Sequence, residues 1–204
     1  MKTILLFLML LWTPTVIAQQ YPNSQFKRWN EWGCPEDWNC NNDQDCKGKV
    51  RIADKINGGV LLEVQHCFDL KKTDRSNNVN ISYDELTAKI NKGKKVTVRF
   101  QYSFTPKGSD QAYVKIDADF DEEINQSFPQ FLYGTSKDGW LKPAQKIWME
   151  CKLNFNPSGV NFIAPQHCFA NSIRTTFGIM PGKNDEDVTK GSQLTIHQIV
   201  LNIE

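Results

Sequence analysis

The segment VRFQYSFT (98–105) decides the fold class of this chain. Its large apolar residues alternate with polar ones, so Val98 and Phe100 share one face of an extended strand while Arg99 and Gln101 share the other. Alternation with a period of two residues is typical of a β-strand that buries one side. One face of this segment must therefore lie in a core, and the other is open to solvent or to a ligand.

The same alternation recurs in the second half of the chain. It is clear in QAYVKIDADF (111–120) and QKIWMECKLNF (145–155), and weaker in SIRTTFGIM (172–180). In SQLTIHQIVLNIE (192–204) the apolar phase shifts at His197–Gln198, which predicts a β-bulge. Five or more amphipathic strands separated by Gly, Pro and Asn turns indicate an all-β chain folded as an antiparallel β-sandwich.

Two shorter signals complete the expected elements. Asn57-Gly58 lies between apolar runs in VRIADKINGGVLLEV (50–64) and predicts a β-hairpin. NISYDELTAKINKG (80–93) predicts one short helix, because Ser82 and Glu85 match a capping box.

The start of the chain has the features of a secretory signal. Lys2 precedes an apolar run, and Ala18 suits cleavage. The run is shorter than the roughly 20 apolar residues of a membrane span. We therefore expect a secreted, extracellular protein without a membrane span, divided into a signal peptide (1–18), a Cys/Trp-rich segment packed on the domain (19–49) and a β-sandwich (50–204).

The six cysteines, in an exported chain, predict disulfide bonds rather than a zinc site or a catalytic thiol. They are Cys34, Cys40, Cys46, Cys67, Cys151 and Cys168. Six cysteines allow about 15 pairings. We expect Cys151 to pair with Cys168, and the first four to pair among themselves.

Two sequons, at Asn80 and Asn125, are candidate glycosylation sites if the cell is eukaryotic. No cofactor is expected apart from a possible calcium ion. Asp117, Asp119 and Asp121 alternate in DADFDEE and supply the hard oxygen ligands that calcium prefers. The spacing does not match an EF-hand loop.

The polar faces of the central strands offer a candidate ligand site. A saccharide needs a flat ring to stack against its C–H faces, together with fixed donors and acceptors for its hydroxyl groups. Charge-assisted hydrogen bonds are directional enough for the second task. The candidate residues are Arg99, Gln101, Tyr113, Asp117 and Trp148, with Trp140 in a neighbouring loop. The alternative is a solvated sheet face with cross-strand charge pairs.

The order of these segments resembles a known kind of module. A Trp-rich opening is followed by GGVLL (58–62), then KGKKVTVRFQYSF (92–104), a strand of alternating acids, a Trp-containing strand and a closing LTIHQIVLNI (194–203). This order resembles the galactose-binding-like β-jelly roll of carbohydrate-binding modules, especially those appended to xylanases and glucanases. His197 stands where such modules often carry Asp. The resemblance implies a jelly-roll sandwich and non-catalytic sugar binding.

Three functions remain open at this point. The first is a lectin-like protein that binds carbohydrate or glycoprotein through a polar and aromatic sheet face. The second is an extracellular structural or protein-interaction protein, and the third is a polysaccharide-active enzyme. The charge balance, 24 Lys and Arg against 23 Asp and Glu, gives no basic surface typical of nucleic-acid binding. No heptad pattern indicates an oligomeric state.

Overall fold

The computed structural model describes residues 21–41, 49–64, 79–86, 95–120, 130–133, 139–154, 170–180 and 191–203. Within these ranges the regular elements are β-strands. They are β1 (Asn39–Asn41), β2 (Lys49–Asp54), β3 (Gly58–Glu63), β4 (Val79–Leu86), β5 (Lys95–Thr105), β6 (Gln111–Phe120), β7 (Gln130–Tyr133), β8 (Trp140–Leu141), β9 (Ala144–Asn154), β10 (Ala170–Met180) and β11 (Gln193–Ile203). In this part of the chain, no helix has the length and apolar character needed to cross a bilayer.

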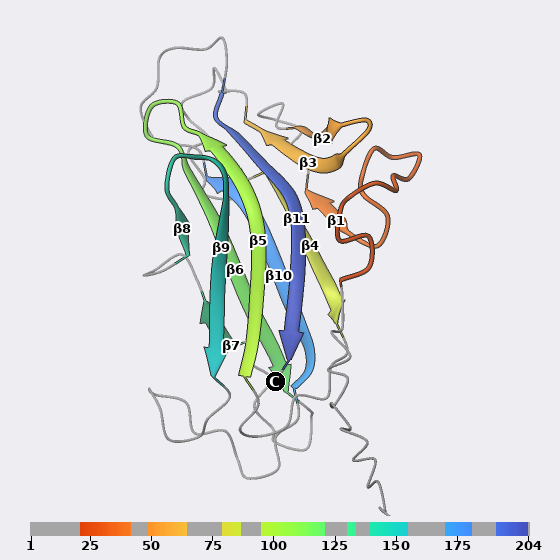
Figure 1. Ribbon diagram of the computed structural model, residues 1–204, viewed down its shortest axis with the longest axis vertical. Coiled ribbons are helices and arrows are strands. Elements are labelled where there is room, and N and C mark those ends of the chain that lie inside the picture. The colour runs from red at the N-terminus through yellow and green to blue at the C-terminus, as the bar shows by residue number, and fades with distance from the viewer. Residues whose placement is uncertain are drawn as a thin grey trace, which may run out of the picture.

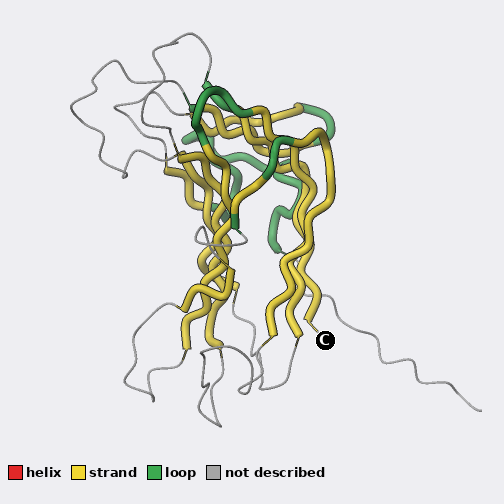
Figure 2. Tube along the Cα trace, turned by 90° about the vertical axis from the view of Figure 1, so that its left-hand side faces the viewer, coloured by secondary structure: helices red, strands yellow, loops and turns green. Residues whose placement is uncertain are grey.

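The strands form two antiparallel sheets that face each other. The first, called the β5 sheet, has the order β2-β3-β11-β5-β9, and the second, called the β10 sheet, has the order β1-β4-β10-β6-β7 with β8 paired to β6. Figure 1 labels the strands, and Figure 2 shows the long strands of the two sheets as separate layers. The expected jelly-roll β-sandwich is therefore confirmed.

The core lies between the sheets and is built from the apolar side of each strand, as the alternation predicts. In β5 the four residues Val98, Phe100, Tyr102 and Phe104 are all buried. Phe100 meets Phe177 of β10 across the gap, with ring centroids 4.8 Å apart in an edge-to-face arrangement. Burying one large side chain contributes roughly 1.5–3 kcal/mol, so the inward side chains of each strand stabilise the sandwich substantially.

The segment before β1 completes the β5 sheet at one side. Strand β3 pairs with β11 only as far as Ile196, and beyond that point the N–H of Ile199 donates to the carbonyl of Ser24 at 3.0 Å. The N–H of Gly59 donates to the carbonyl of Gln25 at 2.8 Å. Gly58 has φ +81°, and a Cβ there would collide with the Gln25 carbonyl oxygen. The N-terminal segment therefore takes the place of a strand beside the lower half of β11.

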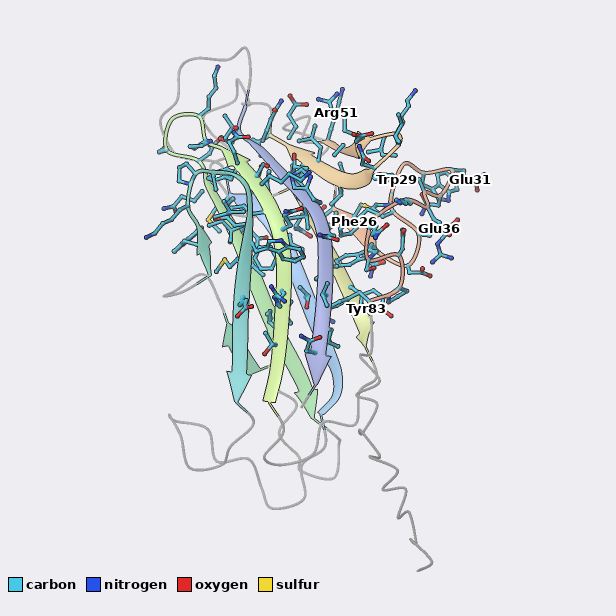
Figure 3. All side chains as sticks on the ribbon, viewed as in Figure 1. Phe26, Trp29, Glu31, Glu36, Arg51 and Tyr83 are labelled. Carbon is cyan, nitrogen blue, oxygen red and sulfur yellow. A yellow bond between two sulfur atoms is a disulfide. The ribbon has the colours of Figure 1, made fainter. Side chains whose placement is uncertain are left out.

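Aromatic residues of this segment enter the core. Tyr21, Phe26 and Trp38 are buried, and Trp38 packs against Phe26 with ring centroids 5.0 Å apart. The hydroxyl of Tyr21 forms a 2.6 Å hydrogen bond with that of Thr175 in β10. Figure 3 shows Phe26 on the side of the segment that faces the strands, and Glu31 and Glu36 on the side away from them.

A disulfide bond joins Cys34 to Cys40 and fixes the loop that leads into β1. This bond confirms part of the expected pairing among the first four cysteines. Cys46, Cys67 and Cys168 lie outside the described residues. The sulfur of Cys151 is buried in β9, and its pairing with Cys168 stays a prediction.

The predicted helix is wrong for its first half. Residues 79–86 form strand β4, which pairs with β1 on one side and β10 on the other. Val79, Ile81 and Tyr83 all point into the core. A helix cap contributes about 1 kcal/mol, which is less than the burial of three large side chains and two rows of backbone hydrogen bonds. Residues 87–93 of the predicted helix lie outside the described residues.

Two bulges interrupt the β5 sheet on either side of β5. One lies at His197, between Ile196 and Gln198 of β11, and confirms the sequence prediction. The other lies in β9, where the pairing with β5 shifts between Phe104↔Ala144 and Tyr102↔Ile147. At this second bulge Lys146 has φ +52°.

Two tryptophans of the N-terminal segment should differ sharply in their effect on stability. Trp38 is 4% exposed and Trp32 is 81% exposed. We expect Trp38→Ala to lower the free energy of unfolding by about 3–5 kcal/mol, as for other core aromatics. Trp32→Ala serves as the matched control and should change it by less than about 0.5 kcal/mol. Equal effects in urea unfolding would show that this segment does not belong to the core.

Gly178 of β10 should not tolerate a side chain. A Cβ at this position would lie 2.5 Å from Oη and 2.6 Å from Cζ of Tyr113. We expect Gly178→Ala to cost about 1–3 kcal/mol of unfolding free energy, the usual range for overpacking. In a Tyr113→Leu background the added cost should fall, and an unchanged cost in urea melts would contradict the contact.

Candidate ligand-binding face

The six residues predicted to bind a ligand divide evenly between the two sheets. Arg99, Gln101 and Trp148 lie on β5 and β9 of the β5 sheet. Tyr113, Asp117 and Trp140 lie on β6 and β8 of the β10 sheet. The outward faces of two stacked sheets point in opposite directions. The prediction of one shared platform is therefore wrong, because alternation identifies an outward face but not the sheet to which it belongs.

The half of the predicted site on the β10 sheet does not present an aromatic surface. Tyr113 is only 5% exposed, and its ring lies over Gly178 and edge-to-face on Trp140, with centroids 6.4 Å apart. Burial raises the pKa of the Tyr113 phenol to about 12. Because Gly178 and Trp140 both lie against the ring, it has no free face on which a saccharide could stack. Tyr113 is therefore a packing residue. Asp117 lies opposite Arg174 in the register of this sheet.

The half on the β5 sheet forms a continuous outward face. In the register, Gln101 of β5 lies between Gln198 of β11 and Trp148 of β9. The next row places Arg99 between Val200 and Glu150. Side chains directly opposite each other in neighbouring strands lie about 4.5–5.5 Å apart at Cβ. We call these residues and the adjoining bulges the β5–β9 face.

Trp148 is the central aromatic residue of the β5–β9 face, and its neighbours hold it in position. Its side chain is 43% exposed on the outward side of an edge strand. The guanidinium carbon of Arg99 lies 5.2 Å from the centre of the indole ring, a cation–π distance. Arg99 Nε in turn lies 2.8 Å from Glu150 Oε1. One side of the indole is thus covered by a planar cation that is itself fixed by a carboxylate.

Above this row the two bulges meet at Ser103. The backbone N–H of Lys146 donates to Ser103 Oγ at 2.9 Å, and Ser103 Oγ lies 3.0 Å from His197 Nε2. Burial, and secondarily the charge of Lys146, lower the pKa of His197 below its ordinary value of 6.5. The Ser103 hydroxyl thus forms a hydrogen bond with each bulge and joins the two.

The residues around Ser103 were not predicted as site residues. The phase shift in the last strand predicts the bulge at His197, but nothing in the sequence places a second bulge at Lys146. That bulge depends on how β9 registers against β5, which is a tertiary property. Ser103 appears in the sequence only as one of several polar residues on the outward side of β5.

The far end of the same sheet carries a separate polar group. Glu63 of β3 is 7% exposed and forms an ion pair with Arg51 of β2. Gln193 of β11 donates to its second oxygen at 3.1 Å. Both oxygens of Glu63 therefore have partners within the sheet, and this group stabilises the pairing of β2, β3 and β11.

The described residues include only some of the predicted glycosylation and calcium-binding positions. Asn80 lies in β4, paired with both β1 and β10, and Asn125 lies outside the described residues. Asp117 and Asp119 are two residues apart in β6, and Asp121 is likewise outside. Among the described residues, no group of three or more His, Cys, Asp or Glu side chains is arranged to hold a metal ion. Glycosylation and calcium binding stay predictions.

Comparison with known proteins gives structural matches without sequence matches. No protein-family profile matches this chain, and no curated protein matches its sequence. The enzymatically active domain of tailspike protein 4 from bacteriophage CBA120 matches with a TM-score of 0.54 and 9% identity over 90% of this chain and 21% of that one. This chain therefore spans about a fifth of the tailspike's length, and the likeness supports the β-sandwich fold alone.

Several other matching structures are carbohydrate-binding modules, the kind of module that the sequence resembles. The CBM22-1 xylan-binding domain of Xyn10C from Paenibacillus barcinonensis matches with a TM-score of 0.48 and 7% identity over 88% of this chain and 91% of that one. A CBM4 structure matches with a TM-score of 0.47 and 11% identity over 90% and 99%.

Proposed function

We propose that this chain is a secreted, non-catalytic protein that binds carbohydrate through the β5–β9 face. The observation that carries the proposal is Trp148, a half-exposed indole on an open sheet face with Arg99 and Gln101 beside it. Large aromatic side chains are usually buried, so an exposed one held in a defined position favours a binding role.

The chemistry of the face fits a saccharide. A sugar ring has an apolar C–H face that stacks on an aromatic ring, and hydroxyl groups around its edge that need donors and acceptors. Trp148 offers the ring, while the amides of Gln101 and Gln198 offer a donor and an acceptor each in the adjoining strands. Sites of this kind combine an aromatic surface with a few fixed polar groups.

The ion pair between Arg99 and Glu150 lowers the entropic cost of binding. Arginine has many rotamers, and immobilising such a side chain costs about 0.5–1.5 kcal/mol when a ligand binds. Here Glu150 and Trp148 already fix the guanidinium in the free protein. Its remaining N–H groups are therefore oriented before a sugar hydroxyl arrives.

Removal of Trp148 should abolish most of the binding. We expect Trp148→Ala to weaken binding to the best saccharide of a glycan array by about 30-fold, as for a central aromatic hot spot. Arg99→Ala should also weaken it, because it removes a donor and releases the indole. Isothermal titration calorimetry measures both effects.

Trp32→Ala is the matched control, because it removes an exposed tryptophan from the N-terminal segment and leaves the β5–β9 face intact. Its affinity should equal that of the unaltered chain. Full binding by a folded Trp148→Ala variant would contradict the proposed site. Release of reducing ends or unsaturated products during incubation would instead show that the chain is an enzyme.

A further inference from the structure

The two bulges beside Ser103 place two basic side chains at one end of the β5–β9 face. Ser103 lies two residues from Gln101 on the same side of β5, which corresponds to about 7 Å along the strand. The backbone N–H of Lys146 reaches this point from β9, and the imidazole of His197 reaches it from β11. The charge of Lys146 also acts on His197. Bulges re-aim side chains and are over-represented beside functional sites.

The backbone at Lys146 is in an unfavourable conformation. Its φ of +52° lies in the left-handed region, which a residue with a long side chain rarely adopts and which costs about 1–3 kcal/mol. The hydrogen bond from its N–H to Ser103 Oγ helps to hold this conformation. Nothing in the pairing of β9 with β5 requires lysine here, since a glycine would adopt the same φ without strain.

The charges on the β5–β9 face leave Lys146 available for an anion. The other fixed cation, Arg99, is already paired with Glu150. Lys146 is exposed, and within the described ranges its ammonium group has no carboxylate within ion-pair distance. The charge of Lys146 acts weakly on Asp54, whose carboxylate already accepts hydrogen bonds from the backbone N–H groups of Ile56 and Asn57 in its own turn.

We propose that Lys146 and His197 form a subsite for the acidic group of a charged saccharide, either the carboxylate of a uronic acid or a sulfate ester. The inference rests on the proposed function and names the class of sugar that it selects. Trp148 and Gln101 hold a sugar ring, and the acidic group of that ring or its neighbour lies between the ammonium and the imidazole. Ser103 orients the imidazole through its hydroxyl group.

The subsite predicts a specific pH dependence. His197 is neutral at pH 7 because its pKa lies below 6.5. An anion beside it favours the protonated form, so the complex takes up a proton. Affinity for the acidic saccharide should therefore rise as the pH falls from 7 toward 5, where uronates and sulfates are still ionised. Hydrogen bonds from Asn57 and Ile56 lower the pKa of Asp54, so this neighbouring carboxylate stays charged throughout the interval and does not obscure the effect.

The test uses a glycan array that carries neutral, uronate and sulfated forms of the same backbones, followed by calorimetry at about 0.1 M salt, where surface charges are partly screened. We expect the acidic forms to bind about five-fold more tightly than the neutral form, the effect of one exposed ion pair. At pH 7, where His197 is neutral, Lys146→Gln should reduce the acidic forms to the neutral level and leave the neutral form unchanged. His197→Gln should remove the gain at pH 5. The better of the two acidic forms identifies the group.

Lys142→Gln is the matched control, because Lys142 is an exposed lysine just before the same strand. It should leave every affinity unchanged. Equal binding of neutral and acidic forms, or an acidic preference at pH 7 that survives Lys146→Gln, overturns the subsite while the proposed function stands. Binding of no saccharide at all overturns both.

Discussion

The structure depends on the edge-to-face contact between Phe100 of β5 and Phe177 of β10, which joins the centres of the two sheets. Each ring lies on the inward side of its strand. The residues two positions before and after it, on the same side, are also buried. Once these inward sides are fixed, the polar residues between them must point outward, because successive side chains alternate. The core therefore determines which residues are available for a ligand on each outer face.

The N-terminal segment is part of this core rather than an appendage. Trp38 packs against Phe26, Tyr21 and Tyr83, and it also approaches Phe177 with centroids 6.5 Å apart. The backbone of residues 24 and 25 hydrogen-bonds to β11 and β3. The Cys34–Cys40 disulfide limits the freedom of the unfolded loop, which favours the docked form. This segment therefore satisfies backbone groups of β11 that β3 does not reach.

The sequence predicted the strands and the sandwich, but it did not predict which strands share a sheet. Alternation in β5 and the phase shift at His197 are local properties of the chain, and both were correct. The capping box at Ser82 is local too, but tertiary pairing of β4 with two strands outweighed it. Tyr113 and Trp148 have the same pattern in sequence, and only the strand order separates a packed ring from an exposed one. The bulge at Lys146 has no local signal.

The central claim is that a saccharide binds the outer side of β5, β9 and β11. A two-dimensional ¹⁵N–¹H nuclear magnetic resonance titration of the folded chain with its best saccharide tests this directly. The account predicts shifts in the indole N–H of Trp148 and in the amides of Gln101, Ser103 and Gln198, with those of Tyr113 and Thr176 unmoved. Shifts concentrated on β4, β6 and β10 would contradict it.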